Sequence, residues 1–344
     1  MSTQVAHHAA PRLATTRTFN LLRLLADGEF HSGTQLAQHL DISRASVHKA
    51  LHAAEEMGVE LHSVRGRGYR LAAPLQWLDA ARIKDALGKL GSQFHIEVRD
   101  SALSSNTLLM QRVAPDGAPS GTVLALEWQS AGRGRLGRAW HSSLGSALTF
   151  SLLWRFERGL SALPGLSLAV GVGLLRALQQ VGAHNVALKW PNDVLAGRGV
   201  KAQGKLAGIL LEAHGDMLGP SAVVIGIGLN LSLPRALRRQ VGQPLASLAD
   251  VLEVMPQRNQ MLAVILCELY QVLQGFSEQG FAAVRSEWES HHAWQDMPVR
   301  LLRPDGSTLR GVARGVAADG ALQLETPQGM QQCNVGEMSL RKSA

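Results

Sequence analysis

The residues best suited to chemistry lie in one short segment, residues 129–140, with the sequence QSAGRGRLGRAW. Arg133, Arg135 and Arg138 alternate there with glycines, and apolar stretches flank the segment on both sides. Arginine offers planar, permanently charged donors that match carboxylate and phosphate oxygens, and glycine lets the backbone approach a ligand closely. The segment therefore predicts a loop that holds an anion, with a solvated basic turn as the simpler alternative.

The same segment matches the pattern G-x-G-x-x-G at residues 132–137, so a dinucleotide-binding fold has to be tested. That pattern carries this meaning only when a helix follows it. Here the next regular stretch, residues 147–154, is a short apolar run typical of a strand. We therefore reject the dinucleotide-binding interpretation.

Other polar groups border apolar stretches. Lys205 leads directly into an apolar strand-like run, where partial removal from water would strengthen its attraction for an anion. Residues 104–106, Ser-Ser-Asn, open a short helix and suit either a polar ligand or an ordinary helix cap. Trp140 either stacks on a ligand or belongs to the core. Asp193, after the turn at Pro191, either holds Mg²⁺ through water or braces the turn.

Three motifs follow one another along the chain: GRGRLGR at 132–138, KWPND at 189–193 and KLAGILLE at 205–212. In this order they resemble the motifs of the biotin protein ligases. With the N-terminal region described below, the resemblance extends to the bifunctional members that also repress the biotin operon, and it covers about residues 17–341. Lipoate ligases share the central fold, but their longer glycine-rich signature is absent from the sequence.

The resemblance implies roles for individual residues, each read from its position in a motif. The biotin-binding set is Ser104, Ser105, Asn106, Gln129, Arg133, Gly134, Arg135 and Lys205. The nucleotide-binding set is Trp140, Lys189, Asn192, Asn230 and Arg341. Arg135 and Lys205 are the expected catalytic residues. Biotin, ATP and Mg²⁺ are the expected ligands, and the residues that bind the metal are not assigned.

The implied reaction joins biotin to AMP and then transfers biotin to a lysine of a biotin carboxyl carrier protein. Negative charge accumulates on the α-phosphoryl oxygens during in-line attack, so fixed cations matter more than a nucleophilic side chain. The sequence offers no Ser-His-Asp or Cys-His arrangement for a covalent enzyme intermediate, and the reaction requires none.

Residues 17–71 have the pattern of a winged helix-turn-helix. Helices are expected at 18–25, at 33–40 after the cap Ser32 with its capping-box partner Gln35, and at 44–57 after Ser43. A two-stranded wing is expected at 59–71. The expected DNA-binding residues are Arg44, Ser46, His48 and Lys49 on the third helix, and Arg65, Arg67 and Arg70 on the wing. A protein-interaction module of the same shape is the alternative.

The remaining chain predicts an α+β fold. We expect a disordered lead-in at 1–16, a winged helix at 17–73, a mixed-sheet ligase domain at 75–292 and an SH3-like β-barrel at 293–344. Central strands are expected at 94–98, 122–129, 147–154, 186–190, 206–212 and 222–231, and helices at 78–90, 104–113, 164–181 and 259–279. Two features depart from the family: Leu136 replaces a frequent arginine near the dimer interface, and residues 196–204 form an insertion, taken as inert.

Composition limits the choice of partner and compartment. A net charge of +7 and a pI near 9.9 indicate anionic partners without choosing among nucleotide, nucleic acid and acidic protein. Two cysteines without metal-ligand spacing, no membrane-length apolar run and no secretory signal predict a cytoplasmic protein. The leading hypothesis is a ligase that, as an adenylate-bound homodimer, represses transcription at operator DNA. A non-catalytic biotin sensor and a ligase with a vestigial winged helix are the alternatives.

Overall fold

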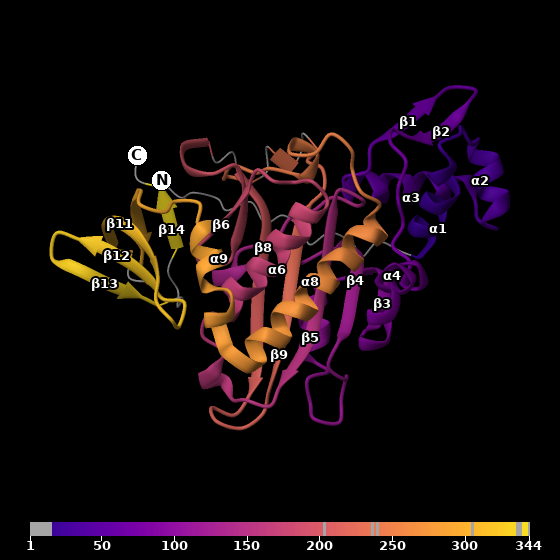
Figure 1. Ribbon diagram of the computed structural model, residues 1–344. Helices are drawn as coiled ribbons and strands as arrows, with labels where there is room; N and C mark the ends of the chain where they lie inside the picture. The colour runs from indigo at the N-terminus through magenta and orange to yellow at the C-terminus, as the bar shows by residue number, and fades with distance from the viewer. Residues whose placement is uncertain are drawn as a thin grey trace, which may run out of the picture.

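The computed structural model describes residues 16–201, 204–234, 237–238, 241–303, 306–334 and 339–342. A small helical unit, a central seven-stranded sheet and a five-stranded sheet follow one another along the chain (Figure 1). Residues 1–15 of the expected lead-in lie outside the described residues, and Thr16 already belongs to the first helix. Within the described ranges, no helix is long and apolar enough to cross a membrane.

The N-terminal unit is the predicted winged helix. It contains α1 (Thr16–Leu24), α2 (Gly33–His39), α3 (Arg44–Glu56), β1 (Leu61–Val64) and β2 (Gly68–Leu71). Ser32 and Gln35 form the expected capping box at the start of α2, and Ser43 caps α3 by accepting from the Ser46 amide. The two strands pair antiparallel as the wing. The predicted fold of this region is therefore confirmed.

The core of the winged helix continues into the central unit. Buried side chains of all three helices cluster with Trp128 and Leu144. These two residues flank the segment 129–140, hereafter the arginine loop. The Leu144 amide donates to the Met57 carbonyl at 3.0 Å, and Gly58 leaves room for Ser143, whose Oγ would lie 2.3 Å from an added Cβ. The two units therefore share one apolar interface.

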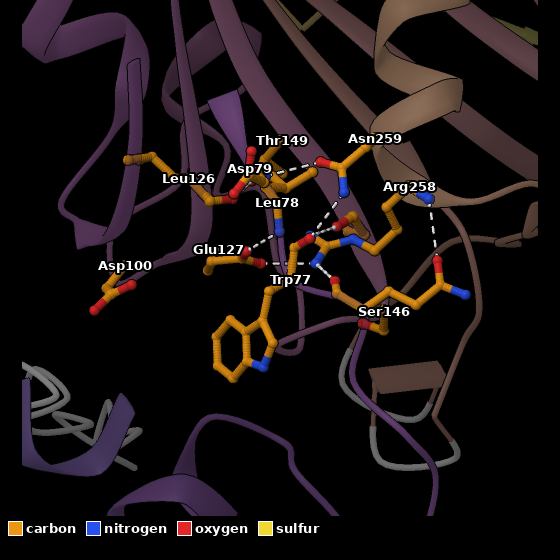
Figure 2. Close-up of polar contacts among 12 residues, drawn as sticks. Trp77, Leu78, Asp79, Asp100, Leu126, Glu127, Ser146, Thr149, Arg258 and Asn259 are labelled. Atoms are coloured by element: carbon orange, nitrogen blue, oxygen red, sulfur yellow. Dashed lines mark hydrogen bonds and ion pairs between the residues drawn. The ribbon is translucent and has the colours of Figure 1, made fainter. Parts of the chain in front are cut away.

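The linker between the two units is held by buried polar groups (Figure 2). The Glu127 carboxylate accepts from the Leu78 amide and forms an ion pair with Arg258, 2.7 Å away, with 1% and 5% of the two side chains exposed. Arg258 also donates to the Gln76 carbonyl, and Asn259 donates to the Trp77 carbonyl. The ion pair therefore fixes the path of the chain that leaves the winged helix.

The central sheet has the order β3-β4-β5-β9-β8-β7-β6. The strands are β3 (His95–Ala102), β4 (Thr122–Gln129), β5 (Ala147–Phe156), β6 (Val186–Lys189), β7 (Asp193–Ala196), β8 (Gly204–Gly215) and β9 (Ser221–Asn230). The pair β3·β4 is parallel and the other neighbours are antiparallel, so the predicted mixed sheet of an α+β fold is confirmed. The sequence did not predict β7, because this four-residue strand already begins at Asp193, the last residue of the KWPND segment.

Helices cover the two faces of the sheet unequally. The long helices α6 (Leu166–Gln180) and α8 (Arg258–Gln279) lie side by side over one face, with α4 (Ala80–Leu87) beside α8 (Figure 1). The short α5 (Ser105–Met110) lies on the other face. Alternate residues of β4 show this: Leu124 and Leu126 pack in the cluster that contains α5, while Val123 and Ala125 pack with the long helices. Because α5 is short, part of this face of the sheet remains open and can form a pocket.

The other helical elements that the structure describes are short. They are α9 (Arg285–Ser290), which the sequence did not predict, and the 3₁₀ segments η1 (Leu25–Asp27), η2 (Gly88–Gln93), η3 (Arg135–Gly137), η4 (Leu160–Ala162), η5 (Gly199–Lys201), η6 (Leu248–Asp250) and η7 (Gly280–Ala283). The predicted helix at 78–90 is split into α4 and η2, and the predicted helix at 104–113 is shorter, ending at Met110. Residues 202 and 203 of the expected insertion lie outside the described residues.

The C-terminal unit is an antiparallel sheet with the order β13-β12-β11-β10-β14. Its strands are β10 (Pro298–Leu302), β11 (Thr308–Val316), β12 (Leu322–Thr326), β13 (Gly329–Cys333) and β14 (Ser339–Lys342). The Trp190 indole, fully buried, donates to the Gly320 carbonyl at 3.0 Å, and the core of this sheet is continuous with that of the central unit. The C-terminal strand β14 is thereby brought next to the KWPND turn. The predicted domain boundaries stay predictions.

Candidate active site

The floor of the candidate site is made of glycines on β8 and β9. Gly208 and Gly228 are direct cross-strand partners, and Gly226 lies two residues earlier on β9. A Cβ added to Gly228 would lie 2.3 Å from the Trp140 ring, and one added to Gly226 would lie 2.1 Å from Asn106 Oδ1. Side chains from loop and helix therefore lie directly on the sheet, because these positions carry no side chain of their own.

Polar groups at the start of α5 form one wall. Ser104 caps the helix, and the Ser105 amide donates to Gln129 Oε1 at 2.8 Å. Asn106 donates to Glu212, and its Oδ1 lies 2.5 Å from the hydroxyl of Ser151. Ser104, Ser105 and Asn106 are buried yet line a pocket above the glycine floor, together with the half-buried Gln129. They form a hydrogen-bonding wall suited to a small polar group.

The arginine loop covers this wall. After β4 the chain forms only η3 and then enters β5, so no helix follows the glycine pattern and the rejection of a dinucleotide-binding fold is confirmed. Arg133 forms an ion pair with Glu212 at 2.8 Å, and Arg135 donates to Asn192 Oδ1 at 3.3 Å. Burial lowers the pKa of Arg135 from its usual value, partly opposed by Asp193. Because free arginine titrates so far above neutrality, Arg135 remains charged.

Trp140 closes the loop over the glycine floor. Its ring packs against Gly208 and Gly228, and Lys205 Nζ lies 5.5 Å from the ring centroid. The indole Nε1 is buried and has no hydrogen-bond partner among the described residues. The ring belongs to the pocket wall, and the alternative of an ordinary core tryptophan does not fit this position.

A buried carboxylate lies between two lysines beside the loop. Asp193 is 2.6 Å from Lys205 Nζ and 3.1 Å from Lys189 Nζ, and all three side chains are at most 18% exposed. Burial alone would raise the pKa of Asp193, but the charges of Lys205 and Lys189 outweigh it and lower that pKa. Burial lowers the pKa of Lys189. The cluster holds one more positive than negative charge.

Two adjoining pockets meet at this cluster. The first is lined by the glycine floor, the α5 wall and the arginine loop. The second is lined by Arg138, Lys189, Asp193 and Arg341 of β14, together with the turn at Pro191. The residues that line both pockets are Gly134, Arg135, Trp140, Asn192 and Lys205. The shared boundary therefore carries two cations and a stacking surface.

The structure brings most of the predicted site residues together. All eight residues of the predicted biotin-binding set line the first pocket. Trp140, Lys189, Asn192 and Arg341 of the predicted nucleotide-binding set line the second. Asn230 lines neither: it is 3% exposed, and its amide donates to the carbonyls of Lys205 and Ala246. In this position Asn230 braces the strand end that carries Lys205.

The predicted DNA-binding residues lie outside the candidate active site, on α3 and the wing of the N-terminal unit. Arg44, His48 and Lys49 of α3 are exposed, as are Arg65 and Arg67 of the wing, while Arg70 is half-buried. Ser46 is half-buried, and its hydroxyl lies 3.0 Å from that of Ser43 in the helix cap. The Ser46 hydroxyl is therefore engaged with the helix cap. The exposed cations remain the candidates for DNA contact.

Sequence reasoning missed two groups in the site, Ser151 and Glu212, which contact Asn106. Arg138, which the sequence predicted as an anion-binding arginine of the loop without placing it in either ligand set, lines the second pocket. A polar residue inside the apolar stretch 147–154 was the available signal for Ser151. For Glu212, the two-residue alternation along β8 was a signal, since it places Glu212 on the same face as Gly208.

Comparisons with known proteins match all three parts of the chain. The HTH domain model matches residues 17–70, the biotin/lipoate A/B protein ligase family model matches 100–230, and the biotin protein ligase C-terminal domain model matches 297–341. The chain is 37% identical over 330 residues to the bifunctional ligase/repressor BirA of Escherichia coli (strain K12), covering 95% of this chain and 98% of the relative. The Salmonella typhimurium BirA is 36% identical over 329 residues, 96% and 99% of the two chains.

The chain belongs to the biotin protein ligases. A solved biotin protein ligase from Aquifex aeolicus in complex with biotin and ATP matches this ligase with a TM-score of 0.61 and 27% identity, over 72% of this chain and 99% of that one. The match with this shorter relative leaves 28% of the present chain without a counterpart. The full-length relatives carry a repressor name in addition to the ligase name, and the ligase described here has the winged helix as well.

Proposed function

We propose that this ligase forms biotinyl-5′-AMP from biotin and ATP and transfers biotin to a lysine of a biotin carboxyl carrier protein. The observation that carries the proposal is the shared boundary of the two pockets. A carboxylate held in the first pocket and a phosphate held in the second would meet where Arg135 and Lys205 line both.

The first step needs cations at the point where charge develops. The biotin carboxylate attacks the α-phosphorus, a carbon–oxygen–phosphorus link forms, and the bond to pyrophosphate breaks. Lys205 and Arg135 are placed to hold the carboxylate near the phosphate and to stabilise the negative charge of the transition state. Asp193 holds Lys205 in position through the 2.6 Å ion pair.

The second step needs an open path to the acyl carbonyl. The acceptor lysine, in its neutral form, attacks that carbonyl; an amide bond forms, AMP leaves, and the amine proton passes to solvent. Trp140 and the arginine loop would hold AMP during this step, because base stacking and arginine–phosphate contacts are not altered by the attack. No side chain of the enzyme becomes covalently bound in either step.

Magnesium enters the proposal as part of the Mg-ATP substrate. Among the described residues that line the two pockets, Asp193 is the one carboxylate, and both neighbouring lysines contact it. Across the described part of the chain, no group of three or more His, Cys, Asp and Glu side chains is arranged to hold a metal ion. A metal held mainly by ATP oxygens fits this arrangement.

The test is incubation of the purified chain with biotin, Mg-ATP and a biotin carboxyl carrier domain. We expect the acceptor to gain the mass of one biotinyl group while pyrophosphate is released. Tight binding of biotin without any mass gain would contradict the ligase reaction and would favour the non-catalytic sensor.

The winged helix supports a second activity in the same chain. We propose that the adenylate-bound ligase dimerises and represses transcription by binding a two-fold operator, with α3 in the major groove and the wing on phosphates. The exposed cations on α3 and the wing support DNA as the partner. Gel shifts on DNA upstream of biotin-synthesis genes should show binding that strengthens with biotin plus ATP. Unchanged binding would separate repression from the adenylate, and no binding would favour a vestigial winged helix.

A further inference from the structure

Two arginines of the wing rest on one aromatic ring. The guanidinium carbon of Arg67 lies 4.2 Å from the centroid of the Phe30 ring, and that of Arg70 lies 4.7 Å from it. Both distances are within the range of cation–π attraction. Phe30 is half-buried and precedes α2, so it lies outside the wing itself. The ring therefore links two cations that would otherwise be flexible side chains on a hairpin.

The backbone holds the wing against the segment that carries this ring. His31 and Tyr69 exchange two hydrogen bonds, each of 2.9 Å, between that segment and β2. Gly68 has φ +102°, and a Cβ there would lie 2.0 Å from the His31 carbonyl oxygen. Any other residue at this position would push the wing away, so the close docking requires glycine.

We propose that Phe30 is a positioning residue for DNA binding, holding Arg67 and Arg70 in place to contact successive backbone phosphates. The inference rests on the proposed DNA-binding function of the winged helix. An arginine that is ordered before binding loses less side-chain freedom when it meets a phosphate. A ring in contact with the two guanidinium groups leaves their outer N–H groups available, because cation–π contact does not consume them as a carboxylate partner would.

The experiment compares full-length variants in binding to a short double-stranded DNA of random sequence, followed by fluorescence anisotropy over a series of salt concentrations. Phe30→Ala should weaken binding about five- to 100-fold, the cost of ordering two arginines, and should leave the salt dependence close to that of the wild type. Phe30→Trp, which keeps an aromatic face, should restore the affinity. Arg67→Gln and Arg70→Gln should each reduce the salt slope by about one.

The outcomes separate the inference from the function on which it rests. Wild-type binding together with unchanged affinity of Phe30→Ala would overturn the positioning role alone. Loss of both affinity and salt slope in Phe30→Ala, without rescue by Phe30→Trp, would show that the ring only supports the fold of the wing, and this would also overturn it. Absence of DNA binding by the wild-type chain would overturn the DNA-binding proposal and the inference together. Thermal unfolding of each variant provides the control for folding.

Discussion

Two buried charge clusters of this ligase differ in the partners that complete them. The cluster of Glu127 and Arg258 pairs one carboxylate with one guanidinium, and its remaining partners are backbone groups of the linker and of Ala147 (Figure 2). The cluster of Asp193, Lys189 and Lys205 places two cations on one carboxylate beside two pockets.

This difference separates a structural cluster from a functional one. A buried ion pair whose other partners belong to the protein holds elements together, and nothing further has to bind. A buried cluster with surplus positive charge pays a desolvation cost that an incoming anion offsets. Arg135, Arg138 and Arg341 add to the surplus along the same pocket. Disrupting the cluster of Glu127 and Arg258 should therefore lower stability. Disrupting the cluster around Asp193 should lower the rate of catalysis.

The largest effect should follow from breaking the structural cluster. Glu127→Ala leaves Arg258 buried without its counter-ion and should cost about 3–5 kcal/mol of unfolding free energy. Denaturant unfolding measures this. The matched control is Glu97→Ala, which removes a carboxylate of the same sheet from a partly exposed pair with Arg112 and should cost about 1 kcal/mol or less. Equal losses in the two variants would remove the distinction between buried and exposed pairs here.

The next effect should be catalytic. Lys205→Ala removes a cation that lines both pockets, and it should slow biotinyl-adenylate formation by about 100- to 1,000-fold, the usual size for one transition-state donor. Pyrophosphate release in single-turnover experiments measures the rate. Lys201→Ala, an exposed lysine in η5, is the control and should leave the rate unchanged. A near-normal rate for Lys205→Ala would transfer the catalytic role to other residues.

A third buried group, His292, sharpens the comparison because no carboxylate among the described residues forms an ion pair with it. Burial lowers its pKa to about 4; the hydrogen bond that His292 Nδ1 donates to Gln295 Oε1 and the charge of Asp296 oppose the shift, and the charge of Arg198 adds to it. The unfolded histidine takes up a proton near pH 6.5 and the folded one only near pH 4, so stability is complete above about pH 6.5 and falls as the pH drops toward 4.

The expected loss over that window is on the order of 3 kcal/mol, because the pKa of His292 is lowered from 6.5 to about 4. His292→Phe should flatten the unfolding free energy between these pH values. The exposed His95→Gln should not change the slope. A slope that persists in His292→Phe would assign the acid sensitivity to other groups.

The smallest effect should distinguish two ligands of one arginine. Arg135→Ala should weaken retention of biotinyl-5′-AMP about tenfold or more and free biotin much less, because a phosphate adds negative charge beside Arg135. Calorimetry with each ligand measures the split, with the exposed Arg310→Ala as the control. Equal losses for both ligands would mean that Arg135 contacts only the biotin part.

Residues close to one another in the chain were enough to predict the local elements and the chemistry of the loop. The spacing of Ser32 and Gln35 predicted the capping box, and the apolar stretch after residue 140 predicted a strand where a dinucleotide fold needs a helix; both hold in the structure. These features depend on residues that are only a few positions apart. Interactions between such close residues can be predicted from the sequence.

Which charged side chains form pairs became known from the fold and not from the order of the residues. Asp193 of β7 and Lys205 of β8 form an ion pair between adjacent strands, and Arg341 reaches the same pocket from the last strand. Asn230 braces a strand end and does not line either pocket. The sequence placed Asn230 in the nucleotide set because position in a motif does not show which side of a strand a residue occupies. Glu127 and Phe30 acquire their roles only through partners 131 and 37 positions away in the chain. Long-range pairing of this kind follows from strand order and register, which local residue preferences do not specify.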